Sequence, residues 1–139
     1  MREILFRAQS KYGEWYYGGI VHQTDYYGNK VDVWFIIDGT ETMDYAVGPA
    51  MKVVPETVCQ YTGLTDRNGV KIFEWDIVRH YSGGKIEDDV GKIFYDTKNC
   101  KFLRTSKTNP KIHYELHADL VYEVIGNIYD NPELTEGLL

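Results

Sequence analysis

The residues best suited to chemistry are two histidines that flank a glutamate, His113, Glu115 and His117. Alternate residues of a strand share one face, and residues four apart on a helix lie one turn apart, so either structure would bring these side chains together. Zinc prefers such ligands, which makes a metal-dependent enzyme one hypothesis. Adjacent polar positions of this kind also arise by chance on protein surfaces. We favour that interpretation, an exposed polar strand or loop, and predict no metal site.

The acidic run Glu87-Asp88-Asp89 is a second group of potential ligands. Divalent cations bind carboxylates, but they also need fixed geometry and neutral oxygen donors. The run follows Gly83-Gly84, which indicates a flexible connection. We therefore predict a solvated loop rather than a cation site.

The two cysteines, Cys59 and Cys100, are the candidate nucleophiles. A catalytic thiol needs a base within reach. Cys59 lies in an apolar extended run, which favours a core position, and no motif places a histidine beside Cys100. The sequence also lacks a P-loop and a dinucleotide-binding glycine motif. We therefore predict no enzyme activity, no cofactor and two free thiols.

Charge is unevenly distributed along the chain. The segment 115–139 carries six acids without a Lys or Arg, which equals the net charge of −6 of the whole chain. Immediately upstream, the segment 98–111 contains five cations and no acid. Such blocks of one sign are typical of interaction surfaces.

Self-association is the function that we favour for this arrangement. The basic and acidic segments are complementary in sign, so they would pair within one chain or between copies, and soluble oligomers are usually symmetric. Leucines near the end of the acidic segment would add an apolar component if they are exposed. The predicted oligomer contact comprises Glu133, Leu134, Leu138 and Leu139.

Nucleic-acid binding is the alternative use of the basic segment. Small β-barrels bind single strands through cationic grooves and aromatic platforms. The acidic balance of the whole chain opposes nonspecific DNA affinity, so we do not favour this alternative. The residues that would contact nucleic acid or a protein partner are Lys98, Lys101, Phe102, Arg104, Lys107 and Lys111. We expect Lys101, Arg104 and Lys107 to be exposed.

Short strands must position these residues. Twelve Tyr, five Phe and three Trp against three Met are typical of pleated sheets. Extended runs separated by turn residues occupy 3–9, 14–23, 31–37, 76–81, 90–95, 100–103 and 121–129. The sequence therefore predicts an all-β protein without long helices.

Three segments are expected to lie outside the strands. Residues 42–55 contain Gly48-Pro49 and Pro55, and we predict an irregular segment that is either a short helix or a covering loop. Residues 105–110 are polar and are predicted to loop out. Asn131-Pro132-Glu133 favours a single helical turn with Asn131 as its cap.

The chain shows no sign of membrane insertion. Its apolar runs fall short of the ~20 residues of a membrane span. The N-terminal residues lack the apolar core of a signal peptide. We therefore expect no membrane contact and a cytoplasmic location.

The stretch 60–78, QYTGLTDRNGVKIFEWDIV, joins the two halves of the chain. Tyr61 and Thr62 favour extended backbone. Asp66-Arg67-Asn68-Gly69 is a strong turn signal, because Asp bonds its own backbone two residues on and Asn and Gly tolerate positive φ. We therefore predict a strand, a tight turn and a return into a sheet.

This stretch resembles the central segment of the YopX family of phage and prophage proteins, in which a QYTGL-type segment leads through a D-x-N-G turn into an EGDIV-type strand. Residues 1–8, MREILFRA, and 123–134, EVIGNIYDNPEL, resemble the opening and closing strands of that family. The resemblance therefore spans the chain. It departs from the pattern at Trp75, where the family has a glycine.

The resemblance implies a lineage rather than a reaction, since the family has no assigned activity. Together with the strand pattern it implies an N-terminal β subdomain, residues 1–58, and a C-terminal SH3-like barrel with a short tail, residues 59–139. It also implies a phage or prophage accessory protein in a bacterial host cell. Such a protein would bind itself or another protein of phage or host.

Overall fold

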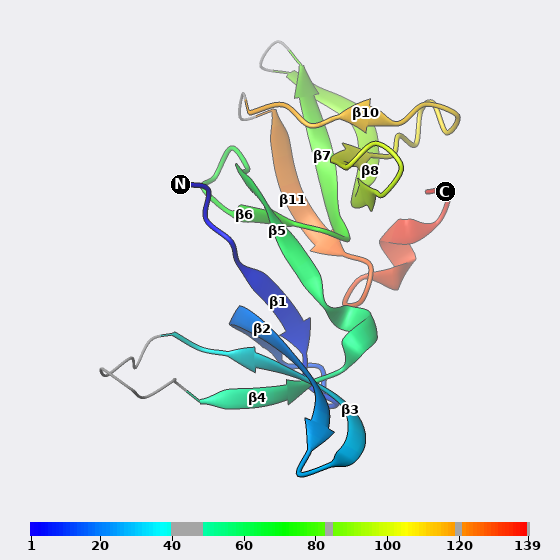
Figure 1. Ribbon diagram of the computed structural model, residues 1–139. Helices are drawn as coiled ribbons and strands as arrows, with labels where there is room; N and C mark the ends of the chain where they lie inside the picture. Colours follow the sequence, from blue (N-terminus) through cyan, green and yellow to red (C-terminus); the bar gives the residue numbers. More distant parts are fainter. Residues whose placement is uncertain (40–48, 83–84, 119–120, 139) are drawn as a thin grey trace. The chain divides into compact units, whose positions relative to one another are not determined.

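The computed structural model describes residues 1–39, 49–82, 85–118 and 121–138, and this part contains eleven strands and two 3₁₀ helices (Figure 1). The chain divides into two compact units, residues 1–61 and 62–139. The predicted all-β class is confirmed, because the 3₁₀ helices have only three and four residues. None of the described helices is long and apolar enough to cross a membrane.

The first unit is an antiparallel sheet. Its strands, in the spatial order β4-β3-β2-β1-β5, are β1 (Phe6–Gln9), β2 (Trp15–Tyr26), β3 (Asn29–Ile37), β4 (Ala50–Val53) and the start of β5 (Cys59–Thr65). The 3₁₀ helix η1 (Pro55–Thr57) precedes β5. Our expectation of an irregular segment at 42–55 was wrong for Ala50–Val53, which pairs with β3 and places Met51 opposite Ile36. Residues 40–48 lie outside the described residues.

Alternation of side chains builds the core of the first unit. Ala8 of β1, Ile36 of β3 and Val53 of β4 are buried, and half-buried apolar side chains pack around them. Beyond this core, β2 and β3 continue as a hairpin. Its two loop residues, Tyr27 and Gly28, both have positive φ, at 49° and 82°, as the type I′ hairpin turn requires.

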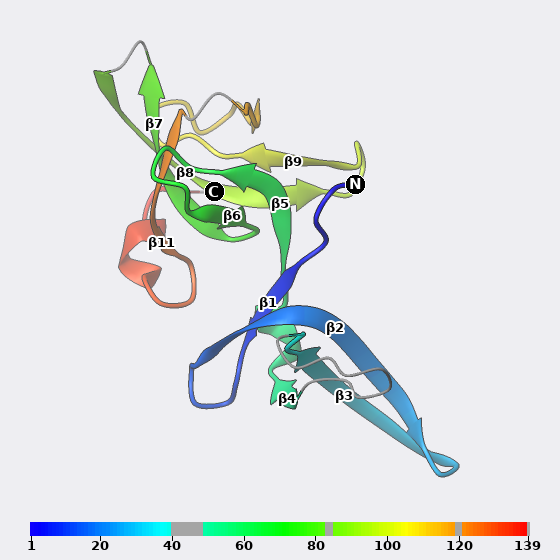
Figure 2. The same cartoon turned by 90° about the vertical axis from the view of Figure 1, so that its left-hand side faces the viewer.

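The second unit contains a five-stranded antiparallel sheet in the order β10-β9-β8-β7-β11. Figure 2 labels β7, β8, β9 and β11 of this sheet. These strands are β7 (Asp76–Ser82), β8 (Lys85–Asp96), β9 (Lys101–Arg104), β10 (Tyr114–Glu115) and β11 (Tyr122–Asn127). The end of β5 and β6 (Lys71–Phe73) also belong to this unit, and the 3₁₀ helix η2 (Pro132–Thr135) follows β11. This order is compatible with the SH3-like roll, which stays a prediction.

The core of the second unit lies between these strands. Ile72, Val78, Ile93 and Tyr122 are almost fully buried and come from β6, β7, β8 and β11. The core therefore joins the stretch 60–78 to strands that come much later in the chain.

The Asp66 turn fixes this junction. The Asp66 side chain is 1% exposed, and its Oδ1 accepts hydrogen bonds from the backbone N–H groups of Asn68 (2.8 Å) and Val70 (2.9 Å). Its Oδ2 accepts a bond from the N–H of Val124 in β11, at 2.9 Å. Gly69 has a φ of 80°, which confirms the predicted turn. The tie to β11 is an addition that the local sequence did not predict.

Candidate binding site

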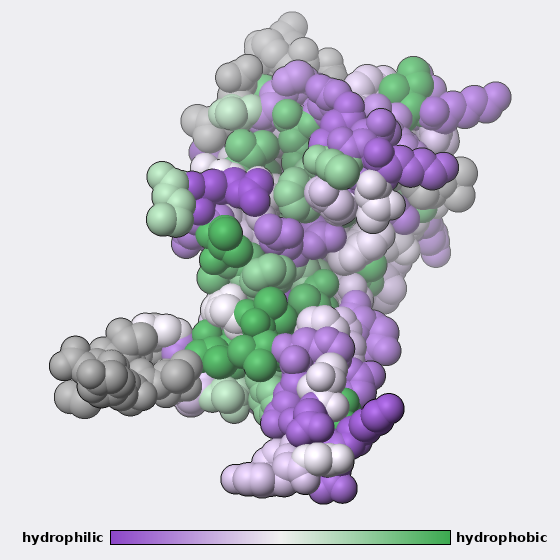
Figure 3. All heavy atoms as spheres, viewed as in Figure 1, coloured by the Kyte–Doolittle hydropathy of each residue, from purple (hydrophilic) through white to green (hydrophobic). Residues whose placement is uncertain are grey.

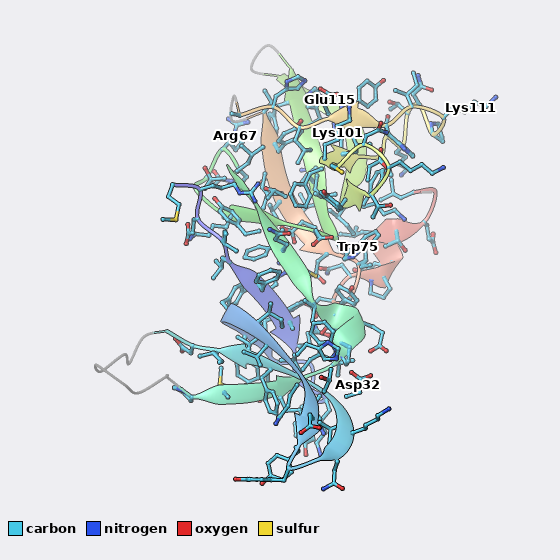
Figure 4. All side chains as sticks on the ribbon, viewed as in Figure 1. Asp32, Arg67, Trp75, Lys101, Lys111 and Glu115 are labelled. Atoms are coloured by element: carbon cyan, nitrogen blue, oxygen red, sulfur yellow. The ribbon has the colours of Figure 1, made fainter. Side chains whose placement is uncertain are left out.

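The basic segment 98–111 does not present its five cations as one surface. Lys98, Lys107 and Lys111 are exposed, and none of them forms an ion pair with a described residue. Lys101 from β9 instead pairs with Glu115 from β10, and Figure 4 shows these two side chains next to one another while Lys111 points away. Figure 3 shows hydrophilic residues spread over this face of the second unit.

Arg104 contradicts our expectation of an exposed cation. The residue is 5% exposed, and its Nη1 donates to Oδ2 of Asp89 at 2.8 Å and to the carbonyl of Thr105 at 3.3 Å. Strand alternation places Arg104 on the inner face, where a charge is retained only with a partner. Arg104 therefore does not contact nucleic acid or a protein partner as predicted.

Asp89 corrects a second expectation, because it belongs to β8 rather than to a solvated loop. Besides Arg104, it accepts hydrogen bonds from the Ser106 hydroxyl at 2.9 Å and from the N–H groups of Lys107 (3.1 Å) and Thr108 (3.3 Å). The side chains of residues 87 and 88 lie outside the described residues. The segment after β9 is therefore held against β8 by one carboxylate.

The same contacts correct the predicted loop at 105–110. Thr105 and Ser106 are buried, and the backbone runs beside β8: the N–H of Thr105 donates to Lys92, and the N–H of Lys107 donates to Val90. Gly91 permits this close approach, because a Cβ there would lie 1.9 Å from the Thr105 carbonyl oxygen. The polar composition of this segment serves internal hydrogen bonds.

The surroundings of Asp89 favour its charged form. Burial alone would raise its pKa, but the hydrogen bonds from Arg104, Ser106 and Thr108 outweigh burial and hold the pKa below its ordinary value. On the surface nearby, the hydrogen bond from Lys101 likewise lowers the pKa of the Glu115 carboxyl. Both carboxylates are therefore ionised at neutral pH.

A cavity of about 270 Å³ opens beside the Asp89–Arg104 pair. Five of the strands of the second unit contribute to its walls. Its lining includes His80, Asp89, Arg104, Tyr114, Glu115 and His117. The ring of Tyr114 covers the Arg104 guanidinium, with 4.6 Å from Cζ to the ring centroid. Charged, aromatic and imidazole groups thus converge on one small polar cavity.

The candidate metal ligands His113, Glu115 and His117 do not lie together, because the two histidines have different surroundings. Glu115 and His117 line the cavity, whereas the ring of His113 packs edge-on against Phe94, 4.9 Å away. Among the described residues, no three His, Cys, Asp or Glu side chains are grouped as a metal site requires. The predicted surface position of all three residues is confirmed, because each is exposed.

A second cavity, of about 480 Å³, lies in the first unit beside β4. Its lining is mainly apolar and includes Tyr12, Tyr16, Met51 and Pro55, with Lys11 and Lys52 at its polar positions. Among the described residues that line it, there is no His, Cys, Asp or Glu.

The acidic tail is partly folded onto its own unit. The predicted helical turn is present as η2, although Asn131 uses its side-chain oxygen to accept a bond from the Asn127 N–H rather than to cap the turn. Glu133 is exposed, Leu134 is half-buried and Leu138 is 7% exposed. The predicted apolar contact required exposed leucines, and Leu138 is not exposed. Leu139 lies outside the described residues.

The remaining predicted positions are the cysteines and Phe102. Both cysteines are thiols rather than halves of a disulfide, with Cys59 fully buried and Cys100 exposed at the β8–β9 turn. Phe102 is half-buried and packs against Tyr95, with 5.1 Å between ring centroids. Tyr95 itself is 39% exposed.

Comparisons with known proteins place the chain in a family. The family model described as YopX protein matches residues 5–136. This chain belongs to the YopX family. The crystal structure of protein EF1440 from Enterococcus faecalis is similar, with a TM-score of 0.55 and 25% sequence identity over 96% of this chain and 99% of that chain. No curated protein sequence matches.

Trp75 stands where the sequence resemblance implies a glycine. Its φ of 65° lies in the left-handed region that favours glycine, so Trp75 adopts a backbone angle that a glycine would tolerate. Two backbone bonds hold it: its N–H donates to Ile93 at 2.7 Å, and its carbonyl accepts from Ile128 at 3.0 Å. The Lys92 ammonium lies 5.7 Å from the centre of the Trp75 ring.

Sequence reasoning missed the Asp89–Arg104 pair and the cavity beside it. One signal was available: Arg104, Ser106 and Thr108 alternate, so an extended chain would place their polar groups on one face, ready for a single acceptor. The composition of the segment concealed it, because runs of Lys, Ser and Thr usually indicate a solvated loop.

Proposed function

We propose that this protein is a phage or prophage accessory protein that acts in the bacterial cytoplasm as a self-associating, non-enzymatic binding module. The observation that carries the proposal is a set of exposed charges of opposite sign in the second unit. Lys98, Lys107 and Lys111 form no ion pair among the described residues, and the same holds for Glu133 and Glu136. Contact between copies would pair them.

The ion pairs within the chain limit which residues can take part in the proposed contact. Lys101 and Arg104 already have acidic partners within the chain, so they are not available to a second copy. Leu138 is buried as well. The proposed contact is therefore mainly polar, and contacts between exposed charges are weakened by salt.

Analytical ultracentrifugation of charge-reversed variants tests the proposal. Changing Lys98, Lys107 and Lys111 to Glu, or Glu133 and Glu136 to Lys, should dissociate the oligomer, and mixing the two variants should restore it. The matched control changes Lys11, Lys30 and Lys52 of the first unit, all exposed, to Glu. A wild-type protein that remains monomeric at high concentration would contradict self-association.

Nucleic-acid binding is the second candidate, and one observation favours it. The partly exposed Tyr95 packs against Phe102 on the hairpin that also carries Lys98, which is the combination of aromatic platform and cation that single strands use. Changing Lys98, Lys107 and Lys111 to Gln should then lower affinity for single-stranded DNA. In fluorescence anisotropy the salt slope should flatten by roughly 0.7 per lost contact. Glu133→Gln with Glu136→Gln should leave this binding intact.

A further inference from the structure

The guanidinium of Arg104 is only partly used by the folded chain. Its Nη1 is bonded to Asp89 and Thr105, but its Nε is closed off from solvent and has no acceptor among the described residues. Buried N–H groups are nearly always paired, and leaving one unpaired costs about 1–3 kcal/mol of stability when no partner is present. The edge of Arg104 that carries Nε is therefore an unused donor within a buried side chain.

We propose that the cavity of the second unit binds a small carboxylic acid, whose carboxylate accepts hydrogen bonds from this free edge of Arg104. Nε and Nη2 form a planar pair of donors that matches the two oxygens of a carboxylate. Asp89 already occupies the other side of the guanidinium through Nη1. The ligand would supply the missing acceptors for Arg104, whose guanidinium Asp89 already holds in place without a ligand.

The charges around the cavity favour a monoanion. Arg104 faces Asp89, and Glu115 is paired with Lys101, so these four groups sum to zero. A phosphate dianion would need a second unpaired cation at the cavity. A single carboxylate needs only the unused donors, with the imidazoles of His80 and His117 in the same walls.

The volume of the cavity and the position of Tyr114 further limit which ligands can bind. The volume of about 270 Å³ lies below the range of about 300–1,000 Å³ that is usual for drug-sized ligands, so we infer a short acid. Tyr114 covers the guanidinium and is 36% exposed. A carboxylate therefore reaches Nε in this proposal only when the Tyr114 ring turns away from the guanidinium.

Titration by NMR tests this site directly. Propionate is the probe, and propionamide, which has the same shape without the charge, is the matched control ligand. Propionate should shift the Nε–Hε resonance of Arg104 with saturable, weak affinity, and propionamide should not. Inorganic phosphate should bind less tightly than propionate. Equal shifts with both organic probes, no shift with propionate, or tighter binding of phosphate would overturn the proposal.

Variants separate the donor edge from general charge. Arg104→Lys keeps a cation beside Asp89 but removes the planar pair of donors, and it should weaken propionate binding roughly tenfold or more. Glu115→Gln removes a negative charge from the cavity wall without emptying the core, and it should strengthen binding by roughly twofold to fivefold. Lys30→Gln, exposed and in the first unit, is the control and should change nothing. Unchanged affinity in Glu115→Gln would place the anion elsewhere, even if Arg104→Lys does not fold.

Discussion

Asp66 and Asp89 are both buried carboxylates of the second unit, at 1% and 7% exposure, but they are held in different ways. Asp66 accepts hydrogen bonds from three backbone N–H groups. Asp89 depends on particular side chains, above all Arg104, which lies fifteen positions away in sequence. The first arrangement needs only a backbone path that returns to the carboxylate, whereas the second needs a matching cation on a neighbouring strand.

This difference predicts different responses to removal of each carboxylate. Asp89→Ala should have the largest effect, a loss of about 3–5 kcal/mol of unfolding free energy, because it leaves the Arg104 charge buried without a partner. Urea denaturation measures this loss. A loss below about 1 kcal/mol would show that water replaces the carboxylate and that the pair is not effectively buried.

A double variant sharpens the comparison. Replacing Arg104 by Met together with Asp89→Ala removes both charges, so much of the lost stability should return. No second substitution can do this for Asp66, since its donors belong to the backbone. Failure of Arg104→Met to rescue would mean that Asp89 contributes mainly through Ser106 and the N–H groups that follow it.

Asp66→Ala should have the next largest effect, a loss of about 2 kcal/mol. The N–H groups of Asn68 and Val70 lie in an exposed turn where water can replace the carboxylate, whereas the N–H of Val124 is less accessible. Asp25→Ala is the matched control, because Asp25 accepts a similar bond from Gly28 in an exposed turn, at 3.1 Å. Equal losses in both variants, measured by thermal unfolding, would show that the tie to β11 adds nothing.

The same contrast explains how much could be predicted from the sequence. Strands and the Asp66 turn follow from local rules: alternation of side chains, and Asp, Asn and Gly within four residues. The strand at Ala50–Val53 was missed, because the prolines on either side dominated the local signal. Pairing between strands depends on register, which a single sequence does not reveal.

The candidate site was harder to predict for the same reason. The segment 98–111 was predicted to be a basic surface, whereas the structure places Arg104 and Thr108 in the wall of a cavity. Asp89 was assigned to a solvated acidic run and Arg104 to an exposed block, and each assignment was consistent with its local composition. Only the pairing of β8 with β9 brings the two together.

Acidification offers a milder test of the Asp89 charge. The pKa of Asp89 is lowered in the folded protein, so its charge contributes stability above its unfolded pKa, at about pH 4, and this contribution is lost as the pH falls through the lower folded value. Asp89→Asn lacks the contribution at every pH. The stability difference between wild type and Asp89→Asn should therefore narrow below about pH 4 in urea denaturation at stepped pH. A constant difference would mean that the charge of Asp89 does not matter.

The smallest expected effect concerns the backbone of the Asp66 turn, at Gly69. Gly69 has a φ of 80°, and a Cβ built on it would meet nothing within 4 Å. A Cβ at Gly19 in β2 would also meet nothing within 4 Å, but its φ is not in the left-handed region. Gly69→Ala and Gly19→Ala therefore add the same atom into open space, and they differ only in backbone angle. We expect Gly69→Ala to lose about 1 kcal/mol relative to Gly19→Ala in thermal unfolding, because an L side chain is strained at positive φ. Equal stability of the two variants would mean that the Asp66 turn relaxes to ordinary angles and does not depend on glycine.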